Sequence, residues 1–252
     1  MLLGQYQGEA PLRFKINGNY LGTPRSFDFK FNVENATTRN SYVPRLWANR
    51  KIAYLIDQIR QMGADRNQSS GRTKELVDEI VRLSTKFGIL TEYTSFLATE
   101  ENMAVNGRER REEYQKQAAK KMEDQAMNVR SGMGAVSQEM NVNAQKAAPA
   151  VSRLNSYYDQ SMKKVEITNV QQIADRTFFN RNNQWIDAQL MEGDKAIKAD
   201  SEIEFGTPAF DKFVSQLVSE GRQGILALGS DTLLMLDGKT VLIKMPSQNK
   251  TQ

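Results

Sequence analysis

The chain has 252 residues, which corresponds to one or two domains at about 150 residues each. Hydrophobic residues make up 39% and charged residues 25%, and the net charge is only +4, so charge alone does not indicate nucleic-acid binding. The sequence contains no cysteine and no histidine. Their absence excludes disulfides, zinc sites built from these residues, cysteine nucleophiles and Ser–His–Asp triads.

The first forty residues alternate between apolar and polar side chains, which is typical of strands with one buried face. We expect three antiparallel strands, with Gln5 and Tyr6 in the first. Hairpin turns are possible at 17–19 and at 22–24. Three strands make a poor domain alone, so residues 1–42 are expected to be half of a β-sandwich whose other strands lie outside these 252 residues. Its sheet would then be covered by the following helices or by a second chain, and its open edge would allow a dimer.

Residues 43–101 change to a helical period and predict an αα-hairpin. Pro44 suits the first turn of one helix and Gly63 its end, and Gly88 ends the second helix. The polar stretch 64–71 would link them, and residues 89–98 would be extended or turning. The expected structural anchors in this region are Leu46, Trp47, Leu76, Ile80, Leu83, Phe87, Tyr93 and Phe96. Trp185, farther along the chain, is expected to be a further anchor.

Residues 102–163 are polar and carry both signs of charge. The simplest interpretation is a solvated helix followed by a flexible linker. The alternative is a partner-binding helix that uses Met122, Met127, Met133 and Met140, because methionine adapts to varied partners.

Residues 164–252 predict a small α+β domain. A hairpin is expected around 181–183, with Trp185 packing on Phe179, and a strand at 195–199. Thr207 and Pro208 form a helix start. Strands at 225–228, 232–236 and 240–243 follow, the last two joined by a tight Asp–Gly turn. The fold class is therefore α+β: an antiparallel sheet, an αα-hairpin, a polar helical linker and a small C-terminal α+β domain.

Two sequence features suggest chemistry, and both are weak. Ser161 and Lys164 fit the S-x-x-K motif of penicillin-recognising serine enzymes, but the later motifs of those enzymes match only in part. A serine hydrolase that uses this pair is the least favoured alternative. The second feature is the basic segment 108–121, which could bind nucleic acid or another anionic surface, although the Glu112–Glu113 pair partly cancels its charge. We expect no catalytic, cofactor-binding or metal-binding residue, no cofactor and no membrane-spanning segment.

Two runs in the helical region carry a resemblance to a known family. Residues 43–48 read VPRLWA, and residues 86–97 read KFGILTEYTSFL. They resemble the region just after the von Willebrand factor A domain in inter-alpha-trypsin inhibitor heavy chains and, more closely, in their bacterial relatives, which carry a VIT domain before the A domain. Residues 4–6, the early strands and the segments 175–187 and 226–238 also resemble these relatives.

The resemblance implies a non-enzymatic scaffold and a protein-binding role in an exported or envelope-associated protein. The metal site of the family lies in the A domain, which these residues do not include, so no metal ligand is implied here. Residues 1–42 would be the second half of a hybrid β-sandwich that is completed by strands before the A domain.

Overall fold

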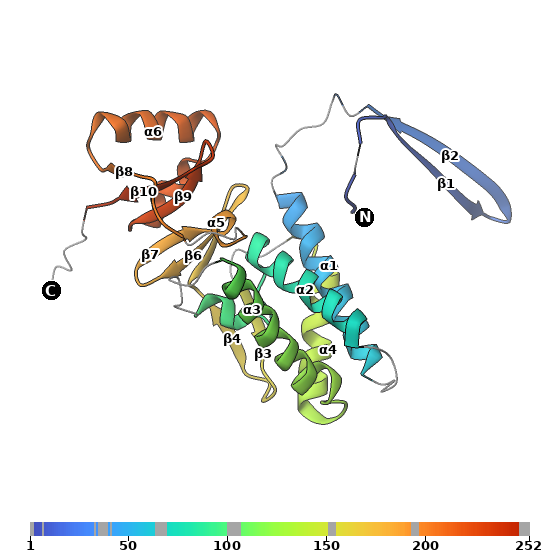
Figure 1. Cartoon of the computed structure of the whole chain (residues 1–252). Coiled ribbons are helices and arrows are strands. Elements are labelled where there is room, and N and C mark those ends of the chain that lie inside the picture. Colours follow the sequence, from blue (N-terminus) through green and yellow to red (C-terminus); the bar gives the residue numbers. More distant parts are fainter. Residues whose placement is uncertain are drawn as a thin grey trace.

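The computed structural model describes residues 3–6, 8–32, 34, 40, 42–63, 70–99, 107–150, 155–192 and 197–246. It confirms the α+β class. In Figure 1 the helices α1 to α4 gather beside a mixed sheet, and the β1–β2 hairpin stands apart from both. The linker expected at 64–71 falls almost wholly outside the described residues.

The N-terminal hairpin consists of β1 (Leu12–Tyr20) and β2 (Thr23–Phe31), which pair antiparallel. It turns at Leu21 and Gly22, whose φ values are 49° and 81°. Two successive residues with positive φ form the tight turn that matches the twist of a hairpin. The turn therefore lies closer to the second expected position, at 22–24, than to 17–19, which lies within β1. Gln5 and Tyr6 are not in a strand, so the described residues here form two strands rather than three.

The expected αα-hairpin is present as α1 (Tyr42–Met62) and α2 (Ser70–Phe87). Pro44 lies in the first turn of α1, and Gly88 follows α2 with a φ of 57°, the left-handed conformation that ends helices. The chain then turns through residues 88–94 into a short 3₁₀ helix, η2 (Ser95–Ala98).

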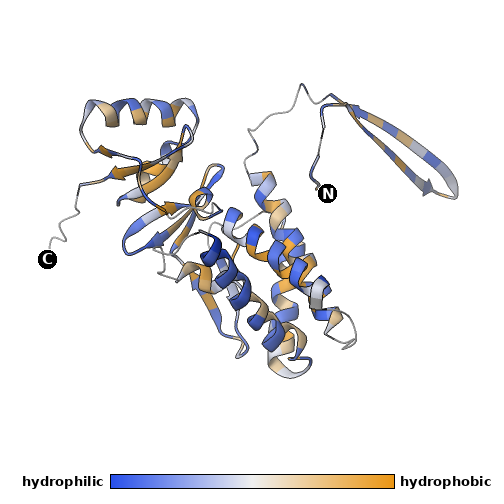
Figure 2. Cartoon of the chain, in the orientation of Figure 1, coloured by the Kyte–Doolittle hydropathy of each residue, from blue (hydrophilic) through white to orange (hydrophobic). Residues whose placement is uncertain are grey.

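The segment interpreted as a helix plus flexible linker is instead mostly packed helix. It contains α3 (Gly107–Lys121), a π-helical turn η3 (Met122–Met127) and α4 (Gly132–Ala147). In this segment the small or apolar side chains Ala118, Met122, Ala126 and Val142 are buried against α1 and α2. Few apolar residues suffice for this packing, because small side chains such as Ala118 and Ala126, which are at most 1% exposed, also contribute to the buried contact. Figure 2 shows how polar α3 is despite this packing.

The C-terminal part forms a six-stranded sheet in the order β5–β6–β7–β9–β10–β8. Its strands are β5 (Val170–Ile173), β6 (Arg176–Arg181), β7 (Gln184–Asp187), β8 (Ser201–Glu204), β9 (Thr232–Leu236) and β10 (Lys239–Lys244). Most pairs are antiparallel, whereas β7–β9 and β8–β10 are parallel. A separate hairpin, β3 (Asn155–Tyr158) with β4 (Lys164–Ile167), extends beside α4.

Two apolar cores flank this sheet. One face of the sheet, with Phe178, Trp185 and Leu234, is covered by α6 (Pro208–Ser219) and the 3₁₀ helix η4 (Gln223–Leu228). The other face, with Phe179 and Ile186, joins the helices and the short α5 (Ala188–Glu192) in one cluster that runs across the boundaries suggested at residues 101 and 163. The result is three layers: α6, the sheet and the helical bundle.

The C-terminal part differs from the sequence prediction at three places. Trp185 lies opposite Asn180 in the sheet register and shares its face with Phe178, so it does not pack on Phe179. The strand expected at 225–228 is η4, which ends at Gly229 with a φ of 68°. The strand expected at 195–199 is absent from its described residues, 197–199, and the strand begins at Ser201 instead.

Candidate functional site

The sequence-predicted anchors lie where the cores need them. Leu46, Ile80, Leu83 and Tyr93 are at most 1% exposed. Trp47, Leu76 and Phe87 are half-buried against the helical core, and Phe96 and Trp185 are nearly buried. These residues serve packing, and they do not converge on one cavity.

Ser161 and Lys164 are not arranged for catalysis. Ser161 lies in the exposed turn between β3 and β4, where its backbone N–H donates to the Asp159 carboxylate. The Lys164 ammonium pairs with Glu166 at 2.6 Å. This hydrogen bond raises the pKa of Lys164, which is the opposite of what a general base requires.

Several basic side chains of helix α3 are buried or bonded to other residues of the chain. Arg110 is buried, Arg111 donates to the backbone oxygen of Glu192, and Lys121 donates to the Ser95 hydroxyl. Arg108 pairs with Glu112 one turn along the helix. The face that α3 leaves to solvent is therefore of mixed charge and offers few unpaired phosphate ligands.

The methionines suggested for partner binding do not share one surface. Met122 is fully buried and Met127 is half-buried beneath α1. Met133 and Met140, on α4, are 62% and 40% exposed. Half of the proposed set is therefore core.

One face of the β1–β2 hairpin is an exposed apolar surface built from several large side chains. The cross-strand pairs Leu12–Phe31, Phe14–Phe29 and Ile16–Phe27 place their side chains on that face. Of these six, all but Leu12 are exposed by between 40% and 56%. Figure 2 shows the alternation of hydrophobic and hydrophilic residues along both strands. Of the two covers expected for this sheet, the described helices do not provide one.

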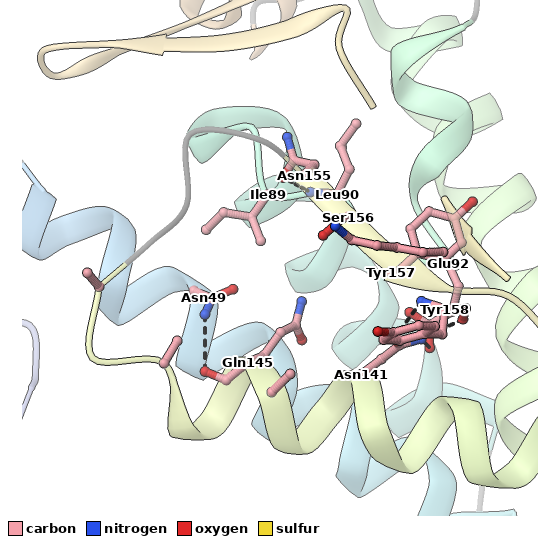
Figure 3. Close-up of a pocket in the computed structure, with 14 residues that line it drawn as sticks. Asn49, Ile89, Leu90, Glu92, Asn141, Gln145, Asn155, Ser156, Tyr157 and Tyr158 are labelled. Carbon is pink, nitrogen blue, oxygen red and sulfur yellow. Dashed lines mark hydrogen bonds between the residues drawn. The ribbon is translucent and has the colours of Figure 1, made fainter. Parts of the chain in front are cut away.

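A cavity of about 230 Å³ lies between α1, α4, β3 and the loop after α2 (Figure 3). Its wall is rich in side-chain amides, from Asn49, Asn141, Gln145 and Asn155. The Asn49 amide donates to the Gln145 backbone oxygen, and the Asn155 oxygen accepts from the Leu90 N–H at 3.0 Å. Asn141 donates to the Tyr158 backbone oxygen and accepts from its N–H, and so fastens β3 to α4.

One carboxylate reaches this cavity. Glu92, in the loop before η2, is only 9% exposed and accepts a 3.0 Å hydrogen bond from the Asn141 amide. Burial raises its pKa to about 7, although Asn141, its own backbone N–H, the charge of Arg60 and the Tyr93 hydroxyl all act in the opposite direction. Glu92 also lines a neighbouring cavity with Lys121 and Gln138.

Neither Glu92 nor the amides around it were expected from the sequence. The one available signal was a carboxylate within an otherwise uncharged run, residues 87–98. The amides on α1 and α4 had no signal, because polar residues on an amphipathic helix usually face solvent.

We expect the Glu92→Gln variant to lose a pH dependence of stability. The folded pKa is raised above the usual 4.5, so this group favours the folded state below about pH 4.5 and progressively loses that effect as the pH rises through 7. The contribution lost is about 3 kcal/mol. Urea unfolding followed by tryptophan fluorescence should therefore find the variant the more stable protein near pH 8. The exposed-site variant Glu113→Gln serves as control. Parallel stability curves for wild type and Glu92→Gln would contradict the assignment.

Comparisons with protein-family models, with curated proteins and with solved structures found no match to this chain. Among the described residues, no helix is long and apolar enough to cross a membrane, and no group of acidic side chains is placed to hold a metal ion.

Proposed function

We propose that this chain is a non-enzymatic scaffold and protein-interaction module, the region that follows a von Willebrand factor A domain in an exported or envelope-associated protein. The observation that carries the proposal is the uncovered apolar face of the β1–β2 hairpin. The resemblance of the runs at 43–48 and 86–97 supports the family assignment.

The exposed part of that face is comparable in size with the largest apolar patch of a monomer. Five of its side chains are about half exposed and offer roughly 500 Å² of apolar surface, taking about 200 Å² for a whole aromatic side chain. The largest apolar patch on a typical monomer is roughly 300–600 Å². An isolated two-stranded hairpin is at best marginally stable in water, so this hairpin gains stability when its face is covered.

The partner that fits this face is another β-sheet with an apolar side. Phenylalanine and isoleucine side chains that alternate with polar ones are the inner face of a sandwich, in which two sheets pack about 10 Å apart. In the proposed protein, that second sheet comes from the strands that precede the A domain.

We expect the double variant Phe14→Ser/Phe29→Ser to weaken strongly the binding of this face to the proposed second sheet. The test first reads the coding sequence upstream of residue 1, where an Asp-x-Ser-x-Ser motif is expected, and produces the segment before that motif separately. Adding this segment to the 252-residue chain should reduce the fluorescence of a dye bound to exposed apolar surface. The double variant should bind the segment at least about a hundredfold more weakly, because two aromatic contacts are lost.

The control is Lys15→Ser/Lys30→Ser, which changes the opposite face of the same two strands. It should bind the segment as the wild type does. Equal loss in both double variants, or the absence of any A-domain motif upstream, would contradict the proposal. A dimer formed by the chain through the same phenylalanines would also contradict it, because the face would then be covered by a second copy.

A further inference from the structure

The buried carboxylate of Glu92 has no counter-ion among the residues that the structure describes. Within the described part of the chain, no ammonium or guanidinium group lies within 4.0 Å of its oxygens. Buried charges in proteins are normally paired or neutralised, because an isolated ion loses its hydration on burial. A carboxylate that is 91% buried and lines a cavity therefore marks a place for a positive charge.

The rest of the wall suits an organic cation. The Asn49 carboxamide oxygen makes no hydrogen bond to any described residue, since only its nitrogen is engaged, with the Gln145 backbone. Figure 3 shows the Gln145 side chain extending from α4 toward the cavity. The side chains of Tyr157 and Tyr158 also line it, and aromatic rings attract cations through their negative faces.

The positive groups nearest this cavity in the described part of the chain are engaged with other partners. From α1, Arg60 acts on Glu92 at a distance but is bound to Glu139 at 2.7 Å. From β4, Lys164 lines the cavity but is paired with Glu166. From α3, Lys121 lines only the neighbouring cavity and donates to Ser95.

We propose that this cavity binds a small organic cation, a primary ammonium or a guanidinium group, with the Glu92 carboxylate as its counter-ion and Asn49 and Gln145 as hydrogen-bond acceptors. The cavity volume of about 230 Å³ limits the size of the ligand. It is below the roughly 300–1,000 Å³ of pockets for drug-sized molecules, so it admits a head group with a short stem. The raised pKa of Glu92 agrees with a missing positive charge, and a bound cation would lower it.

The test uses the full chain, labelled with ¹⁵N and ¹³C, and two probes, propylammonium and methylguanidinium chloride. At least one is expected to shift the side-chain amide signals of Asn49 and Gln145 with a dissociation constant on the order of 1 mM. The same titration should lower the pKa of Glu92, read from its carboxylate carbon. Binding should be about tenfold or more tighter near pH 8 than near pH 5, because the carboxylate is then ionised.

Two variants and a neutral probe make the result specific. Glu92→Gln keeps the shape and removes the charge, and should weaken binding about tenfold or more. Gln145→Leu removes an acceptor whose side chain bonds no described residue, and should weaken binding by a smaller factor. Acetamide, which is neutral, should not bind. The matched control Glu113→Gln changes net charge equally on exposed α3 and should leave binding unchanged.

The source of the cation is decided by a further probe, Nα-acetyl-lysine methylamide. If it binds at least as tightly as propylammonium, the natural ligand is a basic side chain of a protein partner. If only the small amine binds, the ligand is a free amine. Equal binding to wild type and Glu92→Gln, or no shift of the Asn49 and Gln145 amides with either cation at about 100 mM, a hundredfold above the expected dissociation constant, would overturn the proposal.

Discussion

Replacing Asp187 by alanine is expected to lower the free energy of unfolding by about 3–5 kcal/mol. Asp187 is fully buried at the end of β7, and its carboxylate pairs at 2.7 Å with Arg176 of β6, which is 9% exposed. The same carboxylate accepts the Gln189 N–H at the start of α5. Burial raises the pKa of Asp187, although the Gln189 N–H and Arg176 act in the opposite direction.

The large effect arises because the substitution leaves a guanidinium in the core without its counter-ion. Arg176 would keep only its hydrogen bond to the Met235 backbone oxygen. Urea unfolding near pH 7 gives the measurement. The double variant Arg176→Met/Asp187→Leu should recover most of the loss, because it removes both charges and fills the space.

The matched control for Asp187 is Asp175→Ala, which breaks the pair with Arg222 on the surface. The side chain of Asp175 is 46% exposed, against 0% for Asp187. Its removal should cost at most about 1 kcal/mol, since exposed ion pairs contribute little. A similar cost at both positions would show that the buried pair of Arg176 and Asp187 contributes no more to stability than the exposed pair of Asp175 and Arg222.

The Gly88→Ala variant is expected to be destabilised by about 2–4 kcal/mol. Gly88 ends α2 with a φ of 57°, a conformation that a side chain makes costly. A Cβ atom there would also lie 3.0 Å from Val170 Cγ1 and closer still to Thr177 Cγ2. Thr177 is 2% exposed and lies in β6, so it cannot move away without disturbing the sheet.

Gly221→Ala separates the two causes. Gly221 also follows a helix, α6, with a φ of 69°, but a Cβ atom there meets nothing within 4 Å. It should therefore lose only the cost of the backbone conformation, about 1 kcal/mol. Thermal unfolding of both variants under one condition checks the difference. Equal losses would mean that the contact between Gly88 and the sheet contributes nothing.

Much of the local structure follows from short-range signals. The helices α1, α2 and α6 follow from apolar periodicity and from the residues that begin or end them. Thr207 accepts the Phe210 N–H as a helix cap, and Gly88 ends α2 as expected. The β9–β10 turn at Asp237–Gly238 follows as well, because both residues take positive φ there.

The structure differs from the sequence prediction where the local pattern is weak, or where the same pattern fits two kinds of secondary structure. The apolar run at 225–228 fits a strand or a short helix, and its packing under the sheet made it η4. The segment 102–163 was interpreted as a solvated helix and a flexible linker because it has few apolar residues, yet Ala118, Met122, Ala126 and Val142 are buried in the core. The face of Trp185 depended on register, and a shift of one residue reverses the side of a sheet on which a side chain lies.

The sequence by itself determined the α+β class, the αα-hairpin, the tight turns and the exclusion of cysteine and histidine chemistry, because these depend on composition and on residues close together in the chain. Only the tertiary structure decided that the helices share a core with the C-terminal sheet and that none of the described helices covers the apolar face of β1–β2. It also decided that Glu92 meets Asn141, 49 residues away, at a buried cavity. The reason is that burial and charge pairing depend on which distant segments come into contact, and no local pattern encodes that.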